Sequence, residues 1–133
     1  MIFLHYNRMN DKKQLGVWAE DTALAYLKKQ NLLLIERNFN TARGEIDLIM
    51  QDAHVLVFTE VRYRKNQNFG GALASVTRNK QQRLILAAQT YLNSHKKLAD
   101  SEARFDVISI EGEAFSGNIN IEWIKNAFIN ELT

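Results

Sequence analysis

The sequence has no cysteine and no proline, and it contains only six glycines. Without cysteine, disulfide bonds, thiol catalysis and zinc sites that need thiolate ligands are excluded. No apolar run approaches the roughly 18–20 residues that a membrane-spanning helix needs. The apolar stretch Met1–Leu4 is too short for a secretory signal peptide. We therefore predict a cytoplasmic protein with no membrane partner.

The chain length and composition are typical of one soluble domain. The 133 residues are 46% hydrophobic and 24% charged, which suffices for one sizeable core. This composition argues against a disordered or low-complexity chain. We expect residues 1–10 to form a flexible leader and residues 11–133 to form a single domain.

Positive charge is concentrated in the middle of the chain. No Asp or Glu occurs between Val61 and Ala99, so all 15 acidic residues lie outside this stretch. Eight basic residues fall within it: Arg62, Arg64, Lys65, Arg78, Lys80, Arg83, Lys96 and Lys97. A basic face beside an acidic region suits a protein that binds a polyanion near a metal site. A solvated basic helix explains the same pattern equally well.

Hydrophobic periodicity predicts two helices and about five strands. The helices are expected over residues 11–30 and from Ser75 or Thr77 to about Lys97. Strands are expected over residues 32–39, 44–51, 54–63, 104–112 and 118–123. The order α-β-β-β-α-β-β predicts an α/β (α+β) fold in which helices flank a mixed central sheet.

Two acidic residues occur where an ordinary strand would not carry them. Asp47 lies in the middle of an apolar strand, and Glu60 lies near the end of the next one. The short connection predicts a hairpin, and a turn centred near Asp52 puts Asp47 roughly opposite Val57, with Glu60 further along. The carboxylates converge at the rim of the sheet if the strands twist or bulge. Two carboxylates together with substrate phosphate oxygens are a donor set that Mg²⁺ accepts.

Charged residues near this pair extend the hypothesis. Arg62 leaves the same strand face as Glu60, so it can contact a phosphate that the metal holds. Glu20 lies on the apolar stripe of the first helix, which is costly unless it is paired, in a cleft or near a metal. Lys80 is a candidate phosphate contact. Alternatively, Glu60 and Arg62 form an exposed pair worth less than about 1 kcal/mol, Glu20 is a helix-end charge, and Lys80 and Arg83 are solvated.

Other catalytic classes have little support in this sequence. The three histidines fall in the leader, at a turn and at a helix end, so no Ser-His-Asp triad is expected. The FGG segment at residues 69–71 is too short for a nucleotide-binding glycine loop.

Taken together, the motifs resemble those of the YraN-like family of small bacterial proteins. These are predicted endonucleases of the PD-(D/E)xK superfamily and are similar to archaeal Holliday junction resolvases. The matching segments cover nearly all of the chain beyond the leader: GVWAEDTALAYL (16–27), ERNFNTARGEIDLIM (36–50), LVFTEVRYR (56–64), FGGALASVTRNKQQRL (69–84), RFDVISI (104–110) and IKNAF (124–128).

The resemblance implies a restriction-endonuclease-like core and a role for each acidic residue. Asp47 and Glu60 would bind Mg²⁺ or Mn²⁺, with the backbone carbonyl of Val61 as a further ligand. Glu20 would approach the metal directly or through water. Arg62 stands where the family usually has a lysine. Arginine cannot act as a base, because its pKa exceeds about 12, but it can stabilise charge on the phosphate.

Our first hypothesis is a metal-dependent endonuclease that hydrolyses phosphodiester bonds in DNA, with branched or junction DNA in repair or recombination as a candidate substrate. Arg64, Lys65, Lys80 and Arg83 would grip flanking phosphates, and a branched substrate would favour a homodimer. Tyr63 and Phe69 are candidates for stacking on a base, although packing within the domain explains them as well. The alternative is a nucleic-acid-binding protein whose nuclease site is degenerate, because Arg62 replaces the motif lysine. A third hypothesis is a scaffold protein with neither property.

Overall fold

The computed structural model describes residues 2–66, 71 and 75–128, with side chains from residue 12 onward. Within these residues, two helices, a short 3-10 helix and five strands follow one another. They are α1 (Ile2–Lys29), β1 (Leu33–Asn40), β2 (Glu45–Asp52), β3 (Val55–Arg64), α3 (Arg78–Ser94), η1 (Lys96–Leu98), β4 (Ala103–Gly112) and β5 (Ile119–Ile124). This is the predicted order, and it confirms the α+β class.

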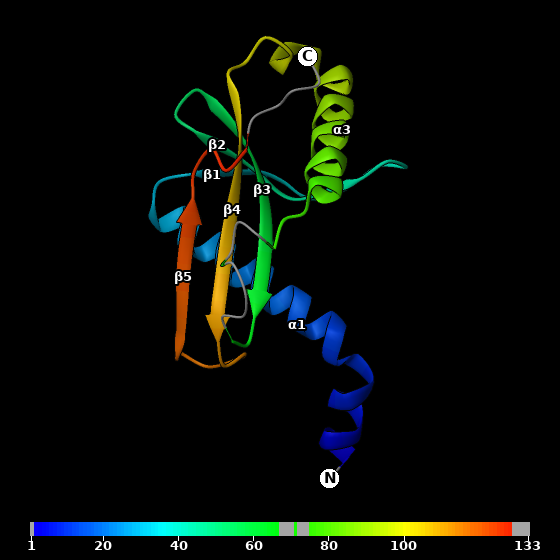
Figure 1. Ribbon diagram of the computed structural model, residues 1–133, viewed down its shortest axis with the longest axis vertical. Helices are drawn as coiled ribbons and strands as arrows, with labels where there is room; N and C mark the ends of the chain where they lie inside the picture. The colour runs from blue at the N-terminus through cyan, green and yellow to red at the C-terminus, as the bar shows by residue number, and fades with distance from the viewer. Residues whose placement is uncertain (1, 67–70, 72–74, 129–133) are drawn as a thin grey trace.

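One boundary was wrong. Helix α1 begins at Ile2, before the predicted start near Asp11. No proline or glycine precedes Gly16, so nothing in the preceding residues interrupts a helical backbone. The first turns of α1 extend beyond the edge of the sheet (Figure 1).

The five strands form one mixed sheet in the order β1-β2-β3-β4-β5. Strands β3 and β4 are parallel, whereas the other neighbours are antiparallel. A parallel pair requires a crossover connection, and α3 with η1 lies within that connection. Figure 1 shows α1 crossing behind the strands and α3 lying beside β3.

Each helix packs against its own hydrophobic cluster. Ala19, Ala23, Leu24 and Leu27 of α1 are buried with one set of strand residues. The α3 residues Leu84, Ile85, Ala87, Ala88 and Tyr91 are buried with another. Thr77 caps α3, and its hydroxyl accepts a hydrogen bond from the Lys80 N–H at 3.3 Å. The sheet is therefore covered on both faces.

Asp106 is the most deeply buried acid among the described residues, and its role is structural. Its carboxylate accepts hydrogen bonds from Arg104 Nε at 3.0 Å, from Trp123 Nε1 at 2.9 Å and from the Asn126 N–H at 2.9 Å. Arg104 also pairs with Asp52 at 2.9 Å. The network links β4 to β5 and to the β2–β3 hairpin, and it occupies the carboxylate with partners inside the protein.

Among the described residues, no helix is both long enough and apolar enough to cross a membrane.

Candidate active site

Asp47 and Glu60 face each other across the β2–β3 hairpin. The ladder pairs Asp52 with Val55 and Leu48 with Thr59. One further step in the same register places Asp47 opposite Glu60. The predicted pairing of Asp47 with Val57 was therefore wrong. The turn lies at residues 53–54 rather than at Asp52, and this shifts every cross-strand pair.

The two strands separate just beyond the last ladder pair, and the Asp47 side chain bridges the gap. Asp47 Oδ2 accepts a hydrogen bond from the Val61 N–H at 2.8 Å. The carboxyl groups of Asp47 and Glu60 lie close enough for each to affect the pKa of the other. The carboxylates therefore converge as the hypothesis requires, through the separation of the strands at the rim of the sheet.

Burial controls the electrostatics of this pair. Removal from water raises the pKa of Asp47 to about 6, although the hydrogen bond from Val61 opposes the rise. Burial together with repulsion from Asp47 raises the pKa of Glu60 to about 8, while Arg62 and Lys80 oppose it. Two buried carboxylates this close favour taking up a positive charge, either a proton or a cation.

Glu20 of α1 lines the same cleft. The cleft has a volume of about 290 Å³, and its lining is drawn from α1, β2 and β3: Lys12, Leu15, Gly16, Ala19, Glu20, Asp47, Glu60, Val61 and Tyr63. Glu20 Oε1 lies 3.4 Å from Arg37 Nη2, which also pairs with Asp21 at 2.9 Å. In the described part of the chain, no group of three His, Cys, Asp or Glu side chains is placed to hold one metal ion. Asp47 and Glu60 are thus the close pair, and Glu20 is held beside them by Arg37.

Arg62 lies next to the carboxylate pair and is mostly buried. Its Nη1 is 4.0 Å from Glu60 Oε1, and the two side chains are 27% and 16% exposed. Arg62 Nε is buried without a hydrogen-bond partner. Arg37 and Arg64 share this feature, so what distinguishes Arg62 is its position next to Glu60.

The other basic residues predicted to contact phosphates differ in solvent exposure and in whether they already form an ion pair. Arg64 is paired with Glu111 at 3.2 Å and is only 17% exposed, so its charge is largely used within the protein. Lys65 is exposed, and Lys80 lies in the first turn of α3, close enough to affect the pKa of Glu60. Arg83 is exposed one turn further along α3. Phe69 lies outside the described residues.

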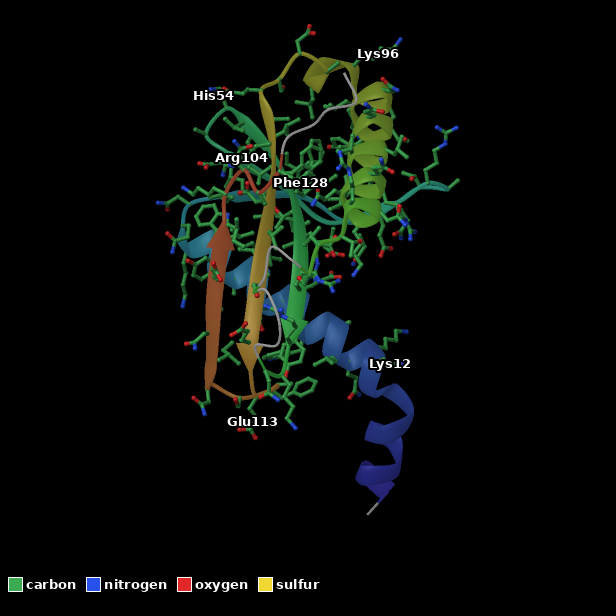
Figure 2. The ribbon with its side chains drawn as sticks, viewed as in Figure 1. Lys12, His54, Lys96, Arg104, Glu113 and Phe128 are labelled. Carbon is green, nitrogen blue, oxygen red and sulfur yellow. The ribbon has the colours of Figure 1, made fainter. Side chains whose placement is uncertain are left out.

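The basic stretch does not form one face. Figure 2 places Lys96 at the end of the molecule opposite to Lys12. The positive charge near the carboxylate pair comes from Arg62 and Lys80 of this stretch, and from one lysine outside it.

That lysine, Lys12, was missed by the sequence reasoning. It is exposed on α1 and lines the cleft with Gly16 and Glu20. The spacing of these three residues, four apart, places them on one helix face. The i, i+4, i+8 spacing within the predicted helix over residues 11–30 was the available signal.

The structure also explains why glycine occupies position 44, the first residue of the GEID segment. A Cβ atom at this position would clash with the Arg83 carbonyl oxygen of α3. Glycine therefore allows α3 to approach the start of β2, and this brings the start of α3 near the carboxylate pair.

The fold and the cleft define an α+β protein with a buried carboxylate pair at one rim of a mixed sheet. The profile of the uncharacterised protein family UPF0102 matches residues 19–110. A UPF0102 protein of Alcanivorax borkumensis is 47% identical over 123 residues, which cover 92% of this chain and 98% of the relative. Others from Herminiimonas arsenicoxydans (51% over 113 residues, 85% of each chain) and Legionella pneumophila (46% over 116 residues, 87% and 95%) are similarly close. The chain belongs to UPF0102, the YraN-like family that the motifs predicted.

Proposed function

We propose that this protein is a Mg²⁺- or Mn²⁺-dependent endonuclease that hydrolyses phosphodiester bonds in DNA. The observation that carries the proposal is the pair Asp47–Glu60, which shares a cleft and has the half-buried cation Arg62 4.0 Å from Glu60. A structural role alone would not require two carboxylates to share a site in which burial and mutual repulsion both oppose their ionisation.

The donors in the cleft fit a hard divalent cation. Asp47 and Glu60 supply carboxylate oxygens, and Mg²⁺ is commonly bound by one or two carboxylates together with substrate phosphate and water. The Val61 carbonyl is a candidate further ligand, and Glu20, already paired with Arg37, would act through water. Such an ion, when bound, lowers the pKa of a water molecule and withdraws charge from the phosphate.

The chain's own cations would then bind and orient the nucleic acid. The Arg62 guanidinium would neutralise a non-bridging oxygen of the scissile phosphate, where negative charge increases as water adds to phosphorus and a P–O bond breaks. Lys12, Lys65, Lys80 and Arg83 would contact flanking phosphates. Arg62 cannot accept a proton, so it would stabilise charge rather than activate the water.

Arg62, at the position of the motif lysine, also fits a second function, which is nucleic-acid binding without cleavage. Where the motif lysine is absent, the same surface serves a protein that binds nucleic acid without cutting it. Both functions predict DNA affinity that falls steeply with salt, because phosphate contacts release counterions. Only the nuclease function predicts metal-dependent cleavage that is lost when Asp47 is replaced, while DNA binding is retained.

The experiment uses linear duplex, single-stranded and four-way-junction DNA with Mg²⁺, Mn²⁺ or chelator. We expect metal-dependent cleavage by the wild type that Asp47→Asn abolishes and the chelator prevents. Asp100→Asn, at an exposed aspartate after η1, is the matched control and should cleave normally. DNA binding by each variant is measured in chelator, so that binding and chemistry are separated.

Three outcomes distinguish the functions. Cleavage that survives Asp47→Asn would point to a contaminating enzyme and contradict the proposed site. Binding without cleavage by the wild type, with cleavage gained in Arg62→Lys, would favour the degenerate-site protein. A wild type that binds neither metal nor DNA would refute both functions.

A further inference from the structure

We infer that Phe115, packed on Trp18, is a stacking platform for an unpaired nucleobase beside the acidic cleft. The inference deepens the proposed function and rests on it. It narrows the substrate class to DNA that offers an unpaired nucleotide close to the cleaved phosphate, such as a single strand, a flap or a junction with unpaired bases at its branch point.

Phe115 is displayed in a way that packing within the protein does not require. It lies between β4 and β5 and is 61% exposed, and its φ of 61° is in the left-handed region that bulky residues rarely adopt. Hydrogen bonds hold this turn, including Glu113 N–H to the Asn118 carbonyl at 3.3 Å and Ser116 Oγ to the Glu113 carbonyl at 2.6 Å. These hydrogen bonds hold the turn in one conformation. The turn presents an aromatic ring to solvent, at the cost of an unfavourable backbone conformation.

The ring is connected to the cleft through two other aromatic residues. The Phe115 and Trp18 ring centroids are 5.4 Å apart, and those of Trp18 and Tyr63 are also 5.4 Å apart. Tyr63 lines the cleft with Asp47 and Glu60. The Tyr63 hydroxyl donates a hydrogen bond to the Gly112 carbonyl at 2.6 Å, which joins the β4–β5 turn to the end of β3.

Positive charge lies on both sides of this aromatic group. A second hollow of about 220 Å³ lies next to the β4–β5 turn and is lined by Lys65, Asn66, Glu111, Gly112, Asn118, Ile119 and Asn120. Glu111 is already paired with Arg64, which leaves Lys65 as the exposed charge of this hollow. Lys12 lines the acidic cleft together with Tyr63. Figure 2 shows Lys12 and Glu113, a neighbour of Phe115 in the turn, toward the same end of the molecule. Both lysines are exposed and can receive backbone phosphates on either side of a stacked base.

This combination favours a nucleobase over an apolar protein partner. Exposed aromatic rings between basic residues are the usual means of binding single-stranded nucleic acid, since every base has a face to stack. A base inside a duplex has both faces covered by its neighbours and cannot use the ring. The platform therefore selects unpaired nucleotides, whereas the phosphate contacts by themselves do not.

The test compares Phe115→Ala with Phe115→Tyr, which keeps a ring, and with Leu33→Ala. Leu33 is the matched control because it is a similarly exposed apolar residue, at 66%, on β1. Affinities for labelled single-stranded, flapped and fully paired DNA are measured by fluorescence anisotropy in chelator, so that no cleavage contributes. Thermal unfolding shows that each variant is folded.

We expect Phe115→Ala to weaken binding to single-stranded and flapped DNA by about 5- to 100-fold, the range for loss of one base–aromatic stack. Duplex affinity should change less than twofold, and Phe115→Tyr and Leu33→Ala should resemble the wild type. Photocrosslinking with single-stranded DNA that carries 5-iodouracil should give an adduct at Phe115.

The inference is overturned if Phe115→Ala binds all three DNAs like the wild type, or weakens them equally. It is also overturned if light scattering shows that Phe115→Ala converts a dimer to a monomer with DNA binding unchanged, because the ring would then pack on a second copy. If metal-dependent cleavage is present while Phe115→Ala has no effect, only the platform fails. Absence of any DNA binding by the wild type would remove the proposed function as well.

Discussion

Replacing Glu60 with glutamine should stabilise the metal-free protein at neutral and alkaline pH, although it removes a residue central to the proposed site. Glutamine has the shape of protonated glutamic acid and still offers a hydrogen-bond donor to Asp47. The substitution therefore imitates the state that burial already favours for Glu60. It removes the ionisation that the folded protein resists.

The sign and size follow from the pKa of Glu60. Burial and the Asp47 charge raise the pKa from 4.5 in the unfolded chain to about 8 in the folded protein. Between these values the folded state binds more protons, so the free energy of unfolding is highest below pH 4.5 and falls until pH passes about 8. One pKa unit corresponds to about 1.4 kcal/mol. Because glutamine retains part of the burial cost, we expect a gain of about 2–4 kcal/mol at pH 8.

Urea unfolding in chelator, followed by tryptophan fluorescence between pH 4.5 and 8, measures this effect. The wild type should lose stability across this range, and Glu60→Gln should lose much less. Mg²⁺ should restore stability to the wild type at pH 8 and should have a smaller effect on the variant, because the proposed site has lost a charged ligand. Glu122→Gln, at an exposed position on β5, is the matched control and should follow the wild type.

A Glu60→Gln protein that is less stable than the wild type at every pH would refute this reasoning. So would an unchanged pH dependence, because it would mean that Glu60 ionises as freely in the folded protein as in the unfolded chain. Equal stabilisation of both proteins by Mg²⁺ would place the ion elsewhere.

Three further predictions test other parts of the structure. Gly44→Ala should destabilise the protein by about 1–3 kcal/mol, because the added Cβ would meet the Arg83 carbonyl; an unchanged urea midpoint would show that α3 moves away freely. Asp106→Asn should cost about 1–3 kcal/mol, since the half-buried Arg104 keeps only Asp52 as a charge partner and the buried hydrogen bonds to position 106 are weakened; retention of full stability would mean that the network contributes little. Arg62→Ala should lower cleavage about 100-fold, the typical loss for a group that stabilises transition-state charge, while duplex binding in chelator changes only a few-fold; parallel losses of both would assign Arg62 to binding alone.

The hairpin illustrates how far a local pattern can predict the candidate site. Alternation of apolar residues identified both strands and showed that Asp47 and Glu60 were out of place in them. The pairing was nevertheless wrong, because it depends on where the turn falls. Ala53 has a φ of 54°, an unusual conformation for a residue with a side chain, and no propensity of alanine predicts it. The tertiary structure selects that turn by aligning the buried faces of the two strands.

Partners of the charged residues were the least predictable part. Position along one strand was enough to put Arg62 on the same face as Glu60, because alternation is a property of the backbone. That Arg37 would hold Glu20, and that Glu111 would occupy Arg64, depends on side chains from other elements. Contacts between residues of different elements produce no repeating pattern in the sequence, so they cannot be predicted from it.

The sequence by itself determined the element order, the α+β class, the family and the residue types of the candidate site, because these follow from local patterning and from motifs spread along the chain. Only the tertiary structure decided which groups meet. It brought Asp47 opposite Glu60, placed Lys12 in the cleft, and joined Phe115, Trp18 and Tyr63 into one aromatic group. The physical reason is that strand register and helix docking are chosen by burial of the whole core, which no single segment encodes.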